Sequence, residues 1–572
     1  MLITIKEGII STDKTDFIYF NKNWMFWFKG YFFIEDNYYT GKAACEIISG
    51  KLTTEGVGNP DVLNGIYQCV MFNKDKQKMF VVNDRFGFHQ LFYFISKAVF
   101  FIGDDFWEVA RNAGAREIDE VSLLEFLQFR FVSGKYTLAK DVFCIEPSSV
   151  YSVDFSIPIV AIKRKQYWQF RYNPTIGSKA IAEERIYNTL NGIIGKYKKS
   201  VFGDKEIGIN LTGGLDSRYI LGLLLQNNVP KEKIRSYTFG SSTCGDLKIA
   251  REITSFLGVK NHEEIFDEYF TDFFDNKNIM DILKDIGFFT YYLQGYGFKK
   301  LNGMYKDVGY LLSGMDGFIL SINASPELFN ITDHRQVADY IYKVNATILS
   351  EQECSLVSGF EPLLIKQKIF KRINENIDKT LDPVSAYYDW TFRNRNRKYL
   401  LSIYGFQNRN TTHLLQYYDY GFVDLMSKMP ASFILGQIPY INSMYKNVFI
   451  GQLEKLRSIP IEKRGVYYKK GEDYIEKAKP RITVKKIIDK LFNPADSSFP
   501  YPIQKILRNS NGVFGKVFIE LRKDGSKYLD ISNCIGLIEK NKRSNNFTRY
   551  GLVAILSVAI FEAMINNNKN GK

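Results

Sequence analysis

The order of apolar and polar residues divides the chain into two parts with different periods. Over residues 1–170, short apolar runs alternate with polar or glycine-containing turns, which is typical of a mostly antiparallel β domain. A polar turn (NKDKQ) between two of these runs predicts a β-hairpin, and Gly87 supplies positive φ for another turn. A few helices are expected as well, one of them at residues 121–129. The clearest strand candidates are GIYQCVMF (65–72), KMFVVND (78–84), QLFYFI (90–95) and AVFFIGD (98–104).

From about residue 180 the pattern changes to helices that alternate with buried strands. EIGINL and KIRSYTFG are short apolar runs suited to parallel strands, and AIAEERIYNTLNGIIGKY, SRYILGLLLQNN and DLKIAREITSFLG have helical spacing. Gly258 ends the last of these helices. This alternation predicts an α/β doubly wound parallel sheet. Residues 330–480 are expected to be mainly helical, and the last ninety residues helical and basic. We therefore expect three parts, at 1–170, 180–480 and 481–572.

The composition argues against several classes of function but does not identify one. The formal net charge of +14 is spread along the chain as lysine, in a composition also rich in Asn, Ile, Tyr and Phe, so we expect no nucleic-acid partner. The six cysteines form no CxxC pair and the four histidines no metal-like pair, which fits a reduced, cytoplasmic compartment. No signal peptide is expected. The longest apolar stretch, residues 552–565, is too short for a membrane span and contains a glutamate, so a buried or docking helix is expected.

One short turn carries the strongest chemical signal. In NLTGGLDSRYI (210–220) two glycines, two hydroxyls and a carboxylate lie where a parallel strand ends and a helix begins. The backbone N–H groups of such a turn and the positive end of the helix favour an anion such as phosphate. Asp216 would repel phosphate unless a divalent cation lay between them, and Mg²⁺ is the natural choice. The turn is neither a Walker A loop nor a dinucleotide fingerprint; an ordinary glycine-rich turn remains the alternative.

The turn also carries a family resemblance. LTGGLDS resembles the S-G-G-x-D-S pyrophosphate loop of the ATP pyrophosphatases and, more narrowly, of the asparagine synthetase family. The resemblance runs in order over roughly residues 60–465. It implies an α+β Ntn-type amidotransferase-like domain followed by an α/β PP-loop ATP pyrophosphatase domain. The other similar stretches are LNGIYQCVMFNKDKQKMFVVNDRFGFHQLFYF (63–94), SLLEFLQFRFVSGKYTLAKDVFCIEPSSVYSVD (122–154), TFG with DLKIAREITSFLGVKNHE (238–263) and YYDYGFVDLMSKMP (417–430).

The resemblance implies a reaction with ATP and Mg²⁺. A substrate carboxylate attacks the α-phosphate of ATP, and an amine then opens the acyl-adenylate, which leaves an amide, AMP and pyrophosphate. Asp216 is implied as a catalytic metal ligand, and Lys463, with Arg464 as its neighbour, as the cation that stabilises the adenylate. A solvated surface charge is the alternative for Lys463. Nucleotide contacts are implied for Thr212, Gly213, Gly214, Asp216 and Ser217 at the pyrophosphate, and for Thr238, Phe239 and Gly240 at adenine.

A second loop, LLSGMDGF (311–318), resembles the family's S-G-x-G-x-D-E loop but is shorter. Ser313 and Gly314 are implied as nucleotide contacts and Asp316 as a second metal ligand. Met315 stands where ordinary asparagine synthetases carry a glutamate. The part of the site that faces the substrate has therefore changed, and the acid need not be aspartate.

The amidotransferase-like part departs further from the family. The family pattern begins Met-Cys-Gly, whereas this chain begins Met-Leu-Ile and its first cysteine is Cys45. We expect a small-molecule carboxylate substrate but no glutaminase activity. The amine would be free ammonia, an amine delivered by a separate protein, or a larger amine, and a homodimer is an option. Two alternatives stay open: a conventional glutamine-hydrolysing asparagine synthase of asparagine biosynthesis, and a non-catalytic nucleotide-binding or scaffold protein.

Overall fold

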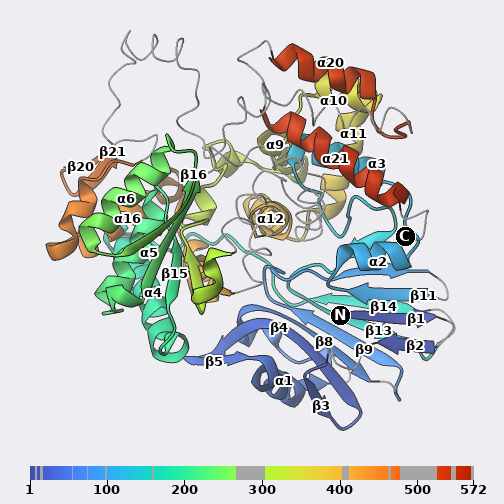
Figure 1. Ribbon diagram of the computed structural model, residues 1–572, viewed down its shortest axis with the longest axis horizontal. Helices are drawn as coiled ribbons and strands as arrows, with labels where there is room; N and C mark the ends of the chain where they lie inside the picture. The colour runs from blue at the N-terminus through green and yellow to red at the C-terminus, as the bar shows by residue number, and fades with distance from the viewer. Residues whose placement is uncertain are drawn as a thin grey trace.

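The protein is described by a computed structural model, shown in Figure 1. It consists of an antiparallel β part near the N-terminus, a parallel sheet with its helices, and a helical layer that carries the end of the chain. The residues that the structure describes are 1–6, 9–12, 17–53, 56–73, 75–96, 99–157, 160–265, 303–401, 411–461, 466–476, 525–542 and 549–567.

Two antiparallel sheets form the N-terminal part, as the alternating pattern predicted. The first has the order β12 (Val142–Cys144), β10 (Phe92–Ile95), β11 (Val99–Gly103), β1 (Leu2–Lys6) and β2 (Ile9–Thr12). The second has the order β14 (Ala161–Gln166), β13 (Ser149–Asp154), β9 (Lys78–Asn83), β8 (Asn64–Asn73), β4 (Trp24–Ile34) and β3 (Tyr19–Asn21), and β5 (Asn37–Thr40) also pairs with β4. A small ladder joins β6 (Leu52–Thr53) to β7 (Gly56–Val57).

Successive side chains of a strand point to opposite faces of its sheet, so apolar residues on the facing sides bury one another and the two sheets stack. On β4, Trp27 points into the layer between the sheets, where it joins Ile102 of the first sheet. Its neighbours Phe26 and Phe28 face the other way and pack against α1 (Gly41–Gly50). The predicted hairpin is confirmed, since β8 and β9 pair antiparallel. Gly87 has φ +59° in the turn that follows.

Helices α2 (Phe106–Asn112) and α3 (Glu120–Phe129) complete this part, and the latter confirms the helix predicted at 121–129. Asp105 and Asp119 cap them, each accepting a hydrogen bond from a backbone N–H in the first turn. An extended segment then leads from β14 to α4 (Lys179–Tyr197), the helix predicted at the start of the α/β part.

The second part is built on a doubly wound parallel sheet, as predicted. Its order is β17 (Lys260–Ile265), β16 (Ile234–Gly240), β15 (Ile207–Asn210), β18 (Tyr310–Ser313) and β19 (Thr412–Leu414). The first strand in the chain is central, with β16 on one side and β18 on the other. The strand order reverses between β15 and β18, and ligands of such sheets bind at the carboxyl ends of the strands at this reversal.

Helices surround the sheet. Here α5 (Leu215–Gln226) follows β15, and α6 (Gly245–Leu257) ends at Gly258 with φ +67°, as predicted. The described residues of the region 330–480 are mainly helical but also include β19 and a hairpin of β20 (Tyr467–Lys470) and β21 (Asp473–Glu476), which the sequence pattern missed. Its helices are α9 (His334–Asn345), α10 (Glu351–Ser358), α11 (Pro362–Asn376), α12 (Pro383–Thr391), the π-helix η8 (Phe392–Leu400), α14 (Tyr420–Met426), α15 (Ala431–Gly436) and α16 (Ile438–Asn447).

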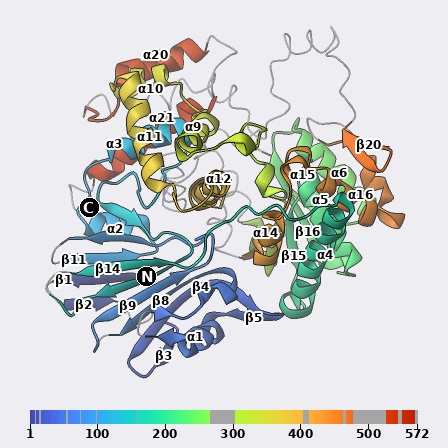
Figure 2. The ribbon, with the colours of Figure 1, turned by 180° about the vertical axis from the view of Figure 1, so that it is seen from behind.

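The end of the chain returns to the N-terminal part. Helix α20 (Ile531–Lys542) packs on α10, and α21 (Arg549–Asn567) packs on α3, as both views show (Figures 1 and 2). The ring of Phe561 in α21 packs against that of Trp107, with centroids 5.4 Å apart and an angle of 45° between the ring planes. The expected buried helix near 552–565 is therefore α21. Within the described residues, no helix combines the length and apolar content that crossing a bilayer requires.

Candidate functional site

The glycine turn connects the carboxyl end of β15 to the first turn of α5. Thr212 and Ser217 hold the turn closed, with their hydroxyl oxygens 3.3 Å apart and the Thr212 N–H donating to Ser217 Oγ at 3.2 Å. The Gly213 N–H donates to Asp246 Oδ1 at 2.6 Å. A carboxylate therefore already occupies one backbone donor of the turn, which shows that this donor suits an anionic oxygen.

The second loop lies directly against the glycine turn. Ser313, at the end of β18, pairs with Asn210 at the end of β15. A Cβ atom on Gly314 would come within 2.2 Å of Ser217 N, and one on Gly317 within 2.3 Å of Asp216 Oδ1. Only glycine fits at either position, so the close approach of the two loops depends on both glycines.

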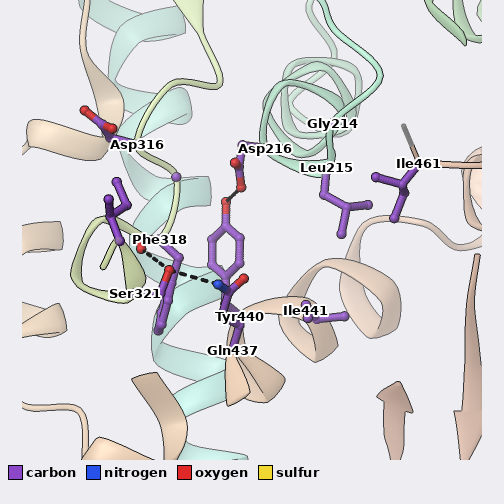
Figure 3. Close-up of a pocket in the computed structure, with 12 residues that line it drawn as sticks. Gly214, Leu215, Asp216, Asp316, Phe318, Ser321, Gln437, Tyr440, Ile441 and Ile461 are labelled. Atoms are coloured by element: carbon purple, nitrogen blue, oxygen red, sulfur yellow. Dashed lines mark hydrogen bonds between the residues drawn. The ribbon is translucent and has the colours of Figure 1, made fainter. Parts of the chain in front are cut away.

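A cavity of about 340 Å³ opens where the two loops meet (Figure 3). Gly214 and Asp216 form one side of it, and Asp316 lies at another edge. The rest of the lining is apolar apart from the Tyr440 hydroxyl and the side chains of Ser321 and Gln437, which are joined by a 2.9 Å hydrogen bond. These apolar walls are Leu215, Phe318, Ile322, Ile441 and Ile461.

Three buried tyrosines hold the two aspartates. The Tyr440 hydroxyl donates to Asp216 Oδ1 at 2.7 Å, and Tyr417 donates to the backbone oxygen of Asp216 at 3.1 Å. Tyr418 donates to Asp316 Oδ2 at 2.5 Å. Burial and the charge of Asp216 raise the pKa of Tyr417 and Tyr440 well above the ordinary value, so both stay protonated donors. Sequence reasoning used YYDYGF only as a resemblance and missed these hydroxyl contacts.

Asp316 is in an unusual environment for a carboxylate. Its backbone has φ +65°, and its side chain points away from Asp216 and towards Tyr418 (Figure 3). Burial raises its pKa to about 6, although the hydrogen bond from Tyr418 opposes this shift. The two predicted metal ligands thus border the same cavity but do not converge on one point.

The residues present fit a cation better than an anion. Among the described residues that line the cavity there are two carboxylates and neither lysine nor arginine. A divalent cation at Asp216 would supply the missing positive charge and would allow phosphate oxygens to approach. No group of three or more potential metal-ligating side chains occurs within the described ranges, so protein ligands alone would not complete the coordination of such an ion.

The remaining predicted site residues are distributed as follows. Thr238, Phe239 and Gly240 form the carboxyl end of β16, beside the glycine turn, where Thr238 Oγ1 donates to the Leu211 oxygen at 2.8 Å. Lys463 and Arg464 lie outside the described residues, although Ile461 lines the cavity.

The six cysteines of the chain all lie within the described residues and all are buried. Burial raises the pKa of the Cys69 thiol well above its ordinary value and that of Cys354 to about 12. A nucleophilic cysteine needs access and thiolate character. None of these thiols is exposed to a substrate in this conformation.

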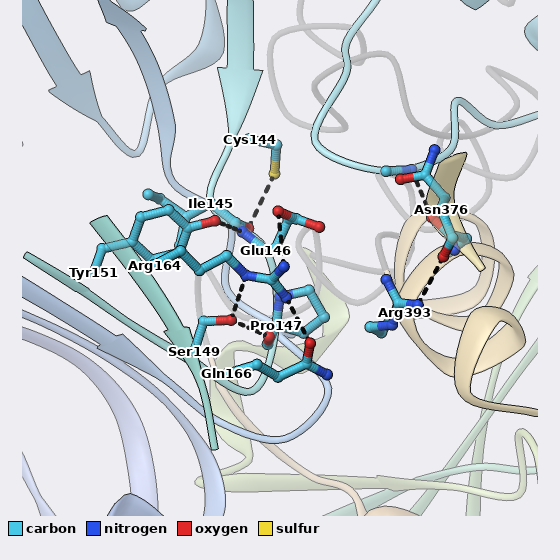
Figure 4. Close-up of polar contacts among 12 residues, drawn as sticks. Cys144, Ile145, Glu146, Pro147, Ser149, Tyr151, Arg164, Gln166, Asn376 and Arg393 are labelled. Carbon is cyan, nitrogen blue, oxygen red and sulfur yellow. Dashed lines mark hydrogen bonds and ion pairs between the residues drawn. The ribbon is translucent and has the colours of Figure 1, made fainter. Parts of the chain in front are cut away.

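A polar cluster between the two parts was not foreseen from the sequence. In η8, Arg397 donates from Nε to the Gly87 oxygen at 3.0 Å, and the Lys398 ammonium donates to the backbone oxygens of Gly134 and Tyr136. Figure 4 shows the segment around Cys144 and Pro147 that η8 contacts, with Arg164 held by Ser149 and Glu146. This cluster attaches the N-terminal part to η8.

Two family models match the chain, in the order in which the parts were described. A glutamine amidotransferase domain matches residues 31–168, and an asparagine synthase domain matches residues 197–288. The second match contains the glycine turn and the end of β16.

Individual relatives agree with these models. Asparagine synthetase (glutamine-hydrolyzing) 1 of Bacillus subtilis is 27% identical over 218 residues, which cover 37% of this chain and 32% of that protein. Amidase chyE of Penicillium rubens is 23% identical over 245 residues, 40% of this chain and 36% of that protein. The matches thus span about a third of these relatives' lengths. The structure of the allosteric regulatory enzyme of purine biosynthesis aligns at 9% identity over 42% of this chain and 60% of that one, with a TM-score of 0.18. The two domain matches, in this order, and the relatives named asparagine synthetase support the asparagine synthetase family for this chain.

Proposed function

We propose that this protein is an ATP-dependent carbon–nitrogen ligase that activates a substrate carboxylate as an acyl-adenylate and passes it to an amine. The observation that carries the proposal is the position of Asp216. Its carboxylate lies at the N-terminus of α5, in a cavity that the second loop closes. A carboxylate beside a phosphate-binding turn repels the phosphates unless a cation lies between them. The position of Asp216 therefore fits a nucleotide that is bound together with a metal ion.

The proposed roles follow from the geometry of the two loops. Backbone donors of Gly213 and Gly214 and the hydroxyls of Thr212 and Ser217 hold the pyrophosphate of ATP, with Ser313 and Gly314 closing the other side. Thr238, Phe239 and Gly240 are assigned to the adenine. Asp216 and Asp316, at different edges of the cavity, are the assigned ligands of Mg²⁺, which when bound would neutralise charge on the leaving pyrophosphate. Lys463 is assigned to the adenylate.

The proposed reaction also assigns a role to each part of the chain. Residues 1–170 form the amidotransferase-like domain and residues 180–480 the ATP pyrophosphatase domain, with residues 481–572 as an extension. In the reaction, a carboxylate oxygen bonds to the α-phosphorus and the bond to pyrophosphate breaks. The amine then bonds to the acyl carbon, and AMP leaves with the oxygen that came from the acid.

The walls of the cavity favour an acid other than aspartate. Aspartate brings a second carboxylate and an ammonium, and both need charged partners when they leave water. Apart from the two aspartates, the described lining offers apolar side chains, the Tyr440 hydroxyl and the neutral pair of Ser321 and Gln437. Met315, which stands in place of the family glutamate, precedes Asp316 in the loop that borders the cavity but is not itself part of the lining. We therefore propose an acid whose remaining part is uncharged.

We further propose that the chain does not hydrolyse glutamine, because all six of its thiols are buried. The amine is then free ammonia or a larger amine. The alternative is a conventional glutamine-hydrolysing asparagine synthase, which the amidotransferase match at 31–168 and the names of the relatives favour. Incubation with glutamine separates the two, since glutamate is released only under the alternative.

Pyrophosphate release tests the leading proposal. The protein is incubated with ATP, Mg²⁺, ammonium and a panel of carboxylic acids, and pyrophosphate and AMP are quantified. We expect release that depends on one class of acid and falls at least about a hundredfold in Asp216→Ala. If Asp216→Ala released as much pyrophosphate as the wild type, and its circular dichroism spectrum showed a native fold, the assignment of the glycine turn to the active site would be wrong.

A further inference from the structure

A second cavity of about 420 Å³ lies between the two parts of the molecule. On one side it is bordered by β4 and by the turn that holds His89. On the other it is bordered by the amino ends of β18 and β19, at Gly309 and Thr411, and by Lys205 before β15. The glycine turn lies at the carboxyl ends of the same strands. The cavity is therefore at the opposite end of the sheet from the proposed active site and is separate from it.

The lining of this cavity, as far as the described residues extend, is basic and contains no carboxylate. Its charged groups are Lys29 and Lys205, and its imidazoles are His89 and His413. The Lys29 ammonium lies 3.8 Å from the Asp104 carboxylate. Because this ion pair is long and the lysine side chain is half-exposed, Asp104 neutralises the charge of Lys29 only weakly. The Lys205 ammonium lies 5.2 Å from the centre of the Tyr310 ring. The cavity thus carries net positive charge.

The imidazoles add hydrogen-bonding capacity rather than further charge. Burial lowers the pKa of His413 to about 3, and burial with the nearby charge of Lys29 lowers that of His89 well below its ordinary value. Both rings are neutral at physiological pH. A neutral imidazole presents one N–H donor and one acceptor nitrogen. The interior is consequently polar, with positive charge at Lys29 and Lys205.

Close packing fixes these side chains in place. Gly30 has φ +100°, and a Cβ atom there would lie 2.9 Å from His89 Nε2. A Cβ atom on Gly309 would lie 2.3 Å from Cδ of Lys205. The imidazole and the lysine stem therefore occupy space that only glycine leaves free. Two glycines, one from each part of the molecule, thus leave the space that His89 and Lys205 occupy.

One buried group in the cavity lacks a partner. Thr411 is 7% exposed, and its hydroxyl has no hydrogen-bond partner among the residues that the structure describes. A buried hydroxyl without a partner is costly, by about 1–3 kcal/mol. A ligand oxygen at this position would satisfy it. The cavity is also within the size range of small-molecule sites.

We propose that the cavity between the two parts binds a small anion that carries carboxylate or phosphate groups, held by Lys29 and Lys205 and by the hydroxyl of Thr411. The site stands apart from the proposed ligase activity and does not depend on it. Because its lining comes from both parts of the molecule, the bound anion joins them and stabilises their packing.

Isothermal titration calorimetry on the full-length protein tests the proposal, with citrate as the carboxylate probe and inorganic phosphate as the phosphate probe. We expect at least one of them to bind, and which one does identifies the ligand group. Affinity should fall at least about tenfold in the double variant Lys29→Ala/Lys205→Ala. It should fall several-fold in Thr411→Val, which keeps the shape of the side chain and removes the hydroxyl.

The matched control is Lys198→Ala/Lys199→Ala, which removes the same charge from exposed positions outside the cavity. Its affinity should equal that of the wild type. Three outcomes overturn the proposal: neither anion binds, the control loses as much affinity as the Lys29/Lys205 variant, or binding survives in the Lys29/Lys205 variant. In the last case the anion occupies another site, such as the glycine turn.

Discussion

At the scale of single residues, the site depends on a glycine that lets two loops touch. Gly317 packs against the Asp216 carboxylate so closely that an added Cβ would overlap it. Gly317→Ala must displace Asp216, and a displacement of about 1 Å costs roughly a hundredfold in rate. We expect such a loss of ATP-dependent turnover, measured as pyrophosphate release. Gly192→Ala, in open space on α4, is the control and should retain activity and gain up to about 1 kcal/mol of stability. Equal activity in the two variants would contradict the close packing of Gly317 against the Asp216 carboxylate.

A tyrosine orients the same carboxylate. Tyr440→Phe removes the hydroxyl that donates to Asp216 and should reduce turnover by about fivefold, which corresponds to about 1 kcal/mol for one hydrogen bond. Tyr445, on the same helix, has a buried hydroxyl with no partner among the described residues, so Tyr445→Phe provides a matched control. The Mg²⁺ concentration for half-maximal activity should rise in Tyr440→Phe alone. If the Mg²⁺ requirement rose equally in Tyr445→Phe, the change would come from a general disturbance of α16 and not from the lost hydrogen bond to Asp216.

The predictability of the site differed between residues for a physical reason. The place of Asp216 beside a glycine turn could be predicted because one short stretch supplies the turn, the helix terminus and the carboxylate, whereas the nucleotide contacts of Thr212 and Gly213 stay predictions. Tyr440 could not, because its partner is more than 200 residues away and its apolar ring is equally suited to a core. Asp316 was found at the cavity, but its contact with Tyr418 was not predicted.

At the scale of elements, η8 places a lysine where no water surrounds it. Burial lowers the pKa of Lys398 to about 8, below its value in the unfolded chain. Between pH 8 and about 10.5 the unfolded state therefore binds more protons than the folded state, and stability rises with pH. The unfolding free energy of the wild type relative to Lys398→Met should increase by up to about 3 kcal/mol from pH 7 to pH 10.

Chemical denaturation at several pH values measures this difference. Lys371→Met, at an exposed position on α11, is the control and should run parallel to the wild type over the same range. A wild type and a Lys398→Met variant that change in parallel would show that the ammonium is not buried in solution.

Elements were predictable where local signals suffice. The β8–β9 hairpin follows from its polar turn, and α6 ends at Gly258 because glycine adopts the left-handed conformation readily. The β20–β21 hairpin was missed within a region expected to be helical. The basic residues of η8 were missed as well, because a run of arginine, asparagine and lysine indicates a solvated surface unless the covering segment is known.

At the scale of the whole molecule, one arginine joins the two parts. Arg85 follows β9, pairs with Asp61 and Asp424 at 2.7 Å each, and lies 4.1 Å from the centre of the Tyr420 ring. Arg85→Ala removes all these contacts and should lower the first thermal transition by about 5 °C or more. Arg335→Ala, an exposed substitution on α9, should change it by about 1 °C at most. Equal melting of both variants would contradict a role for Arg85 in joining the parts.

The central claim is that an acid oxygen attacks the α-phosphate of ATP at Asp216, and an oxygen-18 label tests it most directly. The acid that gives the greatest pyrophosphate release is prepared with oxygen-18 in its carboxylate and turned over with ATP, Mg²⁺ and an amine. Mass spectrometry of the nucleotide product should find one labelled oxygen in AMP, and Asp216→Ala should form no labelled AMP. Label in inorganic phosphate with ADP as the product, or unlabelled AMP, would contradict the account.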